Sequence, residues 1–343
     1  MNIYDLRSDT FTQPSAQMRQ VMAEAVVGDD AYHEDPTINH LEEKGAHMLG
    51  KEAGIFVSSG TMGNLIPLFI NGGRGTEVIT HAQSHIIQHE IGALSAIAGV
   101  MPITLCSAQG LLRATEIEPL IKPKAYDLAK TAMIEVENTI GGICYPLHQL
   151  QEIGKLARKY ALSLHMDGAR LWNASVATGI PVDQLAQDAD TVTVCFSKGL
   201  GAPVGSLLCG TKEFIDQART VRKLLGGGMR QIGILGAAAL WALEHNIERL
   251  AIDHQGAKLL AQALDQSSWA KVNLEDVQTN MVVFSVAGIS SETVVHTLAQ
   301  KGILCCSYDN TSVRLVTHLN LSLERVKEAA DILFSLTKEA FLA

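Results

Sequence analysis

The feature that most constrains the fold is a regular alternation of short apolar runs and longer helical patterns between about residues 35 and 240. Short runs rich in β-branched residues that alternate with amphipathic segments are typical of βαβ units, in which neighbouring strands run parallel. We therefore expect an α/β protein with a large, doubly wound, mostly parallel sheet of the seven-stranded type. The expected strands are 54–59, 77–81, 101–106, 131–137, 162–167, 191–197 and 205–210.

Residues with known preferences for helix ends mark the first long helix of this region. Asp35 can cap its start, Pro36 suits the first turn, and Gly50 fits the position just after the end. Further along, the spacing of leucines and isoleucines between 147 and 161 predicts a helix with one buried face.

The pattern changes after about residue 245. A long helix rich in small residues, expected at 233–250, leads out of the first unit. We predict a large domain over residues 1–245, whose segment 1–30 contributes to the site and to a subunit interface. A small α+β domain is predicted over residues 246–343. Its expected elements are a helix at 251–266, a strand at 281–286, a helix at 291–301, strands at 302–307 and 312–318, and a final helix.

Composition excludes several classes of protein. The formal net charge is −9, whereas proteins that bind nucleic-acid backbones are normally basic. No apolar run approaches the ~20 residues that span a bilayer, and the first residues lack the pattern of a signal peptide. The six cysteines have neither a CxxC spacing nor a pairing rhythm. We expect a soluble, cytoplasmic protein without a metal site, a membrane contact or a nucleic-acid partner.

Three strand ends carry polar residues that could do chemistry. The strand at 54–59 is followed by Gly60 and Thr61, which open a helix and could hold an anion. Asp167 ends one later strand, and Lys198 follows another. Each residue also has an ordinary explanation, as an N-cap, a helix cap or a lysine that reaches solvent.

The combination of these residues is more specific than its parts. Ligands of open α/β sheets bind beyond the carboxyl ends of the strands, which is where all three groups lie. Pyridoxal 5′-phosphate (PLP) needs an anion site for its phosphate, a lysine for the Schiff base and an acid for its pyridine nitrogen. The sequence therefore predicts a PLP enzyme.

At these motifs the chain resembles the low-specificity L-threonine aldolases, PLP enzymes of the fold type I transferase group. The resemblance extends over nearly the whole chain and implies that Lys198 forms the Schiff base and Asp167 pairs with the pyridine nitrogen. It also implies that Gly60 and Thr61 hold the phosphate and that His85 stacks on the ring. The motifs that carry it include "DLRSDTFTQPS" (5–15), "FVSSGTMGNL" (56–65), "HMDGARLWNASVA" (165–177), "FSKGLGAPVGS" (196–206) and "VRLVTHLN" (313–320).

The resemblance also implies how substrate and subunits are arranged. Ser8, Arg170 and Arg314 would hold the substrate carboxylate, with Arg170 also beside the cofactor. Lys223 and Arg230 would help to bind the phosphate, and Tyr32 would reach the substrate, each across a subunit boundary. The implied assembly is a homotetramer, a dimer of dimers with shared active sites.

Two positions depart from the family pattern. Ile140 stands where the family generally has an active-site histidine, and His89 stands where an aromatic residue is more usual. We expect His89, or His85 acting through water, to supply the base that takes the proton of the β-hydroxyl group.

The function implied is retro-aldol cleavage of L-threonine or L-allo-threonine to glycine and acetaldehyde. Another PLP reaction on the same scaffold, either β-elimination or cleavage of another β-hydroxy-α-amino acid, would use the same Lys198 and Asp167. A binding protein that retains the scaffold without catalysis is a further alternative, although it predicts degraded site residues.

Overall fold

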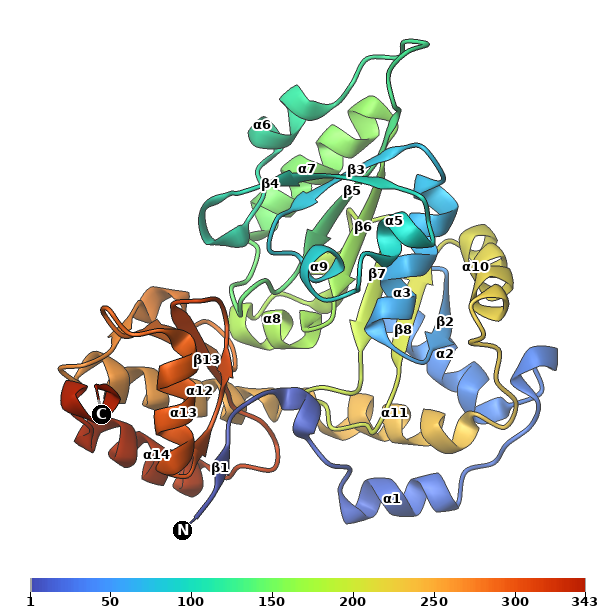
Figure 1. Ribbon diagram of the computed structural model, residues 1–343. Coiled ribbons are helices and arrows are strands. Elements are labelled where there is room, and N and C mark those ends of the chain that lie inside the picture. Colours follow the sequence, from blue (N-terminus) through green and yellow to red (C-terminus); the bar gives the residue numbers. More distant parts are fainter. Residues whose placement is uncertain (1, 343) are drawn as a thin grey trace.

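The computed structural model describes residues 2–342 and contains the expected sheet. Its seven strands lie in the order β2-β8-β7-β6-β5-β3-β4 (Figure 1). Strands β7, β6, β5, β3 and β4 are mutually parallel, and β8 runs antiparallel to both β2 and β7. The prediction of a mostly parallel α/β sheet is thus confirmed. The bounds are β2 Ala53–Val57, β3 Glu77–His81, β4 Met101–Leu105, β5 Thr131–Glu137, β6 Ser163–Gly168, β7 Thr191–Cys195 and β8 Ser206–Gly210.

The helices cover both faces of this sheet. Ile55 and Val57 of β2 pack with residues of α3 and α10, whereas Phe56 between them joins the cluster that contains residues of α7 and α8. This alternation follows from the pleat, which turns successive side chains to opposite faces. The helices up to residue 245 are α1 Ala16–Ala23, α2 Pro36–Met48, α3 Gly60–Pro67, α4 His85–Gln88, α5 Ala93–Ala96, α6 Ala114–Ile117, α7 Leu147–Tyr160, α8 Leu171–Thr178, α9 Val182–Ala186, α10 Lys212–Leu224 and α11 Gly233–His245.

The local sequence predicts the start of one helix correctly and the end of another incorrectly. Helix α2 begins as predicted, with Asp35 Oδ1 accepting the N–H groups of Thr37 and Ile38 at 3.1 Å. Helix α11 was expected to run to residue 250 but ends at His245. The next residue, Asn246, donates its side-chain N–H to the Leu200 carbonyl at 2.7 Å, a contact that no local pattern reveals.

The C-terminal unit is built on a four-stranded sheet of order β12-β13-β10-β9 and lies at the lower left of Figure 1. The run 302–307, expected as one strand, forms two: β11 pairs with β1 near the N-terminus, and β12 pairs with β13. The division into domains 1–245 and 246–343 stays a prediction, and β1 lies with the C-terminal unit. The bounds are β1 Tyr4–Asp5, β9 Lys271–Val272, β10 Met281–Ser285, β11 Ile303–Leu304, β12 Cys306–Ser307, β13 Ser312–Val316, α12 Leu250–Asp265, α13 Ser291–Gln300 and α14 Leu323–Ser335.

Two further features of the fold are the apolar character of its helices and the state of its cysteines. Within residues 2–342, no helix combines the length and apolar character needed to cross a bilayer. All six cysteines are free thiols. The cytoplasmic location stays a prediction.

Candidate active site

Asp167 lies near the carboxyl end of β6 and is 2% exposed. Its Oδ2 accepts a hydrogen bond from Asn64 Nδ2 at 2.7 Å, and its Oδ1 accepts one from the Ala169 N–H at 2.9 Å. Among the described residues, no cation lies within ion-pair distance of this carboxylate. A buried carboxylate held by neutral donors is suited to pair with a protonated ring nitrogen, because a buried charge is costly without a charged partner.

Lys198 lies in the connection from β7 to β8, three residues beyond the last residue of β7. Its side chain is half-buried and makes no hydrogen bond or ion pair within residues 2–342. The positive charge of Lys198 acts on the pKa values of both Asp9 and His85, so the amine lies near both groups. The amine is therefore available for a covalent link to a ligand.

The N-terminus of α3 lies next to the end of β7. A Cβ atom on Gly60 would lie 3.0 Å from Sγ of Cys195, the last residue of β7, so glycine permits this close approach. Ser59 Oγ accepts the Met62 N–H at 3.2 Å. Within the described chain, the N–H groups of Gly60 and Thr61 have no partner, which fits a phosphate at the positive end of the helix.

Arg314 lies in β13, directly opposite Val283 of β10. Its guanidinium is partly buried, its Nε has no hydrogen-bond partner, and no acidic group pairs with it in the part of the chain that the structure describes. Burial and the nearby charge of Arg170 lower the pKa of Arg314. A guanidinium left in this state fits a ligand carboxylate, to which it can donate two parallel hydrogen bonds.

The other two residues expected at the substrate carboxylate are engaged within the chain. Arg170 donates from Nε and Nη2 to the two carboxylate oxygens of Asp9, at 2.9 and 2.6 Å. Ser8 is buried, and its Oγ accepts the Thr10 N–H at 3.2 Å. Sequence reasoning missed Asp9, which also accepts a hydrogen bond from Asn280.

His85 and His89, the two expected bases, have different surroundings. Nδ1 of His85 lies 2.8 Å from Oε1 of the buried Glu90. Burial acts to lower the pKa of His85, but the hydrogen bond to Glu90 and the charge of Asp167 raise it overall. His89 is exposed, and burial of part of its ring, His85 and Arg314 lower its pKa.

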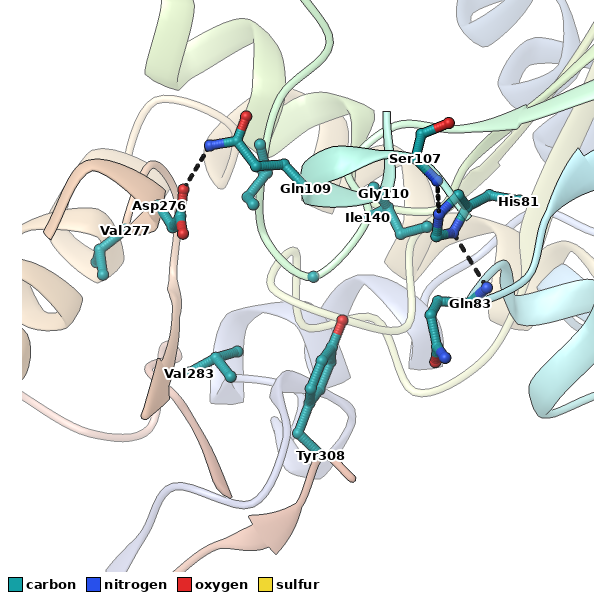
Figure 2. Close-up of a pocket in the computed structure, with 12 residues that line it drawn as sticks. His81, Gln83, Ser107, Gln109, Gly110, Ile140, Asp276, Val277, Val283 and Tyr308 are labelled. Carbon is teal, nitrogen blue, oxygen red and sulfur yellow. Dashed lines mark hydrogen bonds between the residues drawn. The ribbon is translucent and has the colours of Figure 1, made fainter. Parts of the chain in front are cut away.

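Ile140 is 3% exposed and lines a cavity of about 320 Å³ between the two units. Figure 2 shows Ile140 beside His81 on one side of this cavity and Tyr308 on the other. The side chain of Ile140 offers no acid or base. The cavity is a neighbour of the site and is lined by none of the residues assigned to cofactor or substrate.

Tyr32, Lys223 and Arg230 are exposed on the surface of the chain. Tyr32 is 71% exposed, and Arg230 contacts Asp29 at 3.0 Å. In residues 2–342, no hydrogen bond or ion pair joins these three residues to Lys198 or Asp167.

One group of side chains has the spacing of metal ligands. A nitrogen of His85 and carboxylate oxygens of Glu90 and Asp167 lie within 4.8 Å of one another. Glu90 and Asp167 share the carboxamide of Asn64, and Glu90 also bonds to His85, so internal hydrogen bonds already engage this cluster. The absence of a metal stays a prediction.

Comparison with known proteins gives one consistent result. A family model described as β-eliminating lyase matches residues 5–287. A low-specificity L-threonine aldolase of Arabidopsis thaliana is 45% identical, covering 93% of this chain and 92% of the plant protein. The low specificity L-threonine aldolase of Escherichia coli K12 is 40% identical, covering 95% and 97% of the two chains.

Solved structures support the fold. The threonine aldolase of Leishmania major aligns with a TM-score of 0.82 at 20% identity, covering 96% of this chain and 98% of that one. A serine palmitoyltransferase of Sphingomonas wittichii aligns with a TM-score of 0.76 at 17% identity, covering 99% and 88%. The fold is therefore that of the fold type I enzymes, which host more than one reaction.

The fold, the arrangement of the site and the family match define this protein as an enzyme of the β-eliminating lyase family. Membership of this family and of the fold type I group implies dependence on PLP. Within the family, the chain belongs with the low-specificity L-threonine aldolases.

Proposed function

We propose that the protein cleaves L-threonine and L-allo-threonine to glycine and acetaldehyde, with PLP as its cofactor. One observation carries the proposal: the buried carboxylate of Asp167 and the half-buried guanidinium of Arg314 have no ionic partner in residues 2–342. The charges of Asp167 and Lys198 both act on the pKa of His85, and the charge of Arg314 acts on the pKa of His89. A cofactor ring nitrogen and a substrate carboxylate would supply the missing partners. The curated relatives named as threonine aldolases support the choice of reaction.

Four parts of the chain would hold the cofactor. Lys198 would supply the amine for the covalent link, Asp167 would pair with the ring nitrogen, and the N–H groups of Gly60 and Thr61 would hold the phosphate. The bound cofactor supplies an electron sink for the negative charge left on the α-carbon when the Cα–Cβ bond breaks.

The protein's own part in the reaction is positioning and proton transfer. Arg314 binds the carboxylate of the substrate and, with Ser8, fixes its orientation, while Arg170 supports this end of the site through its pair with Asp9. We assign the base to His85, because its pKa is raised whereas that of His89 is lowered. Nε2 of His85 takes the β-hydroxyl proton as the aldehyde forms.

The exposed positions of Lys223, Arg230 and Tyr32 support their proposed action at the site of a neighbouring subunit. Exposed apolar side chains in the same stretches of sequence, Val26 and Leu224, are 68% and 69% exposed. Their burial against a second copy would be favourable. The proposed assembly is a homotetramer in which pairs of subunits share active sites.

The direct test is to incubate the purified protein and PLP with L-threonine and, separately, with L-allo-threonine. We expect acetaldehyde and glycine in equal amounts. Pyruvate and ammonia from a β-substituted amino acid, without acetaldehyde from either threonine isomer, would instead show a β-eliminating lyase.

A further inference from the structure

Buried polar side chains from three parts of the chain form one hydrogen-bonded chain behind His85. Nδ1 of His85 lies 2.8 Å from Oε1 of Glu90, which follows helix α4. Nδ2 of Asn64, in α3, lies 3.0 Å from the same oxygen and 2.7 Å from Oδ2 of Asp167. Glu90 and Asn64 are only 3% and 1% exposed. Asn64 thus joins the partner of His85 to the expected partner of the cofactor ring.

His165 in β6 continues this series of hydrogen bonds. Burial lowers the pKa of His165 to about 4, so its ring is neutral at neutral pH. Its Nε2 lies 3.1 Å from Oδ1 of Asn64, and its Nδ1 lies 2.9 Å from the hydroxyl of Thr191. Because Nδ2 of Asn64 donates to two carboxylates, its Oδ1 is the acceptor, and the neutral ring of His165 donates to it from Nε2. The amide NH₂ of Asn64 then points its two protons at Glu90 and Asp167.

This arrangement decides which nitrogen of His85 carries the proton. An ionised carboxylate only accepts hydrogen bonds, so Nδ1 of His85 must donate to Glu90. The neutral form of His85 is then the Nδ1–H tautomer, and Nε2 is its basic nitrogen. A second carboxyl, Glu137 of β5, accepts the backbone N–H of His85 at 2.8 Å and fixes the start of α4.

The geometry points to Glu90 as a positioning residue for His85. It holds His85 in the Nδ1–H form with Nε2 free for the β-hydroxyl proton, and Asn64 links this pair to Asp167. The inference rests on the proposed function, in which Nε2 of His85 is the base. A carboxylate that orients a histidine and stabilises its protonated form does the same in serine hydrolases.

Glu90 is the charged group most directly coupled to the ring of His85. The titratable groups that act on His85 are Glu90, His89, Glu137, Asp167 and Lys198. Burial lowers the pKa of His85, the hydrogen bond from the ring to Glu90 and the charge of Asp167 raise it, and Lys198 lowers it. Burial and the charge of Asp167 raise the pKa of Glu137 to about 8, and Glu137 bonds to the backbone N–H of His85 whereas Glu90 bonds to the ring itself. Removal of the Glu90 charge should therefore lower the pKa of His85.

The first experiment compares Glu90→Gln with Glu135→Gln in the full-length protein, with and without PLP. Glu135 is a matched control, because it is fully buried in β5 and accepts hydrogen bonds from Thr80 and Ser84 instead of a histidine. Nitrogen NMR of ¹⁵N-labelled histidine, assigned with His85→Phe, reports the tautomer and the pKa of the ring. We expect a lower His85 pKa and a weaker Nδ1–H preference in Glu90→Gln only. An unchanged His85 ring would overturn the inference.

The second experiment measures cleavage of L-threonine against pH. We expect Glu90→Gln to lower kcat by about 10- to 100-fold, the range found when a group that orients a metal-bound histidine is removed. The acid limb of its pH–rate profile should move to lower pH. Glu90→Asp, which keeps the charge, should move this limb less. In a His85→Phe background, Glu90→Gln should lower kcat only slightly further.

A loss of the same size in the His85→Phe background would show that Glu90 does not act through His85. Failure of the wild-type protein to release acetaldehyde would overturn the proposed function instead. The ring-nitrogen measurement tests the Glu90–His85 link in either case.

Discussion

Asp9 accepts two hydrogen bonds from Arg170, at 2.9 and 2.6 Å, and this pair joins the N-terminal segment to the start of α8. Burial acts to raise the pKa of Asp9, but the charge of Arg170 and its hydrogen bonds lower it to about 2. The carboxylate is 0% exposed. Its removal would leave the guanidinium of Arg170 without a counter-ion.

Asp9→Asn should therefore lower the free energy of unfolding by about 3 kcal/mol at pH 7, because breaking one side of a buried pair strands the other charge. Urea unfolding measures this value. Asp5→Asn removes a more exposed pair with Arg7 and should cost less than about 1 kcal/mol. Equal losses in the two variants would contradict the special role of the buried pair.

The same pair predicts a pH dependence of stability. A carboxyl whose pKa is depressed in the folded state stabilises that state above its unfolded pKa, here 3.8. The stabilisation, roughly 2 kcal/mol, is lost as the pH falls from about 4 through 2. Acid titration of the wild type should show this loss, and Asp9→Asn should lack it.

Arg314 should lower the stability of the fold and increase the affinity for the substrate. Arg314→Met removes a half-buried cation without a partner in the described chain, so we expect an unchanged or higher Tm. Arg314→Lys keeps a charge but loses the forked donor and should raise KM for L-threonine by about 10- to 100-fold, with the cofactor's absorbance retained. A large fall in Tm for Arg314→Met would show that the guanidinium has a structural partner instead.

The two histidines should differ in their effect on rate. His85→Phe should lower kcat by about 10²- to 10⁴-fold, the range of general-base catalysis. His89 is exposed and its pKa is lowered, so His89→Phe should leave turnover close to that of the wild type. Steady-state kinetics with L-threonine decide between them, and the reverse order of effects would transfer the role of base to His89.

Gly141 should be sensitive to a single methyl group. Its φ is 58°, and a Cβ atom would lie 2.8 Å from the Tyr308 hydroxyl. Gly141→Ala should lower the free energy of unfolding by about 2 kcal/mol through backbone strain and this clash. Gly288→Ala is the control, because φ is 78° there but the space is open. Tyr308→Phe should restore part of the loss in Gly141→Ala and none in Gly288→Ala.

Local patterns in the sequence predicted the large sheet well. Strands β3 and β5 have the bounds that their apolar runs indicated, and α2 starts at its expected cap. The predicted bounds were wrong where contacts with segments distant in sequence determine the structure. The run 302–307 divides because its first part pairs with β1, about 300 residues away in sequence.

In the candidate site, too, local patterns predicted some residues and missed those that depend on distant contacts. Lys198 and Asp167 stand at strand ends, where the fold class itself points to ligand binding. Glu90 and Asp9 were missed, because their importance comes from contacts with Asn64 and Arg170 that are distant in sequence. An acidic residue in a mostly apolar stretch was the one local signal that could have drawn attention to Glu90.

The most direct test of the central claim is the rate of acetaldehyde release from L-threonine by wild type, Lys198→Ala and Lys212→Ala, each supplied with PLP. Lys212 is a solvent-exposed lysine on α10 and serves as the matched control. We expect release by the wild type and Lys212→Ala, with Lys198→Ala inactive and lacking the yellow colour that borohydride bleaches. Retained turnover in Lys198→Ala would contradict the central claim.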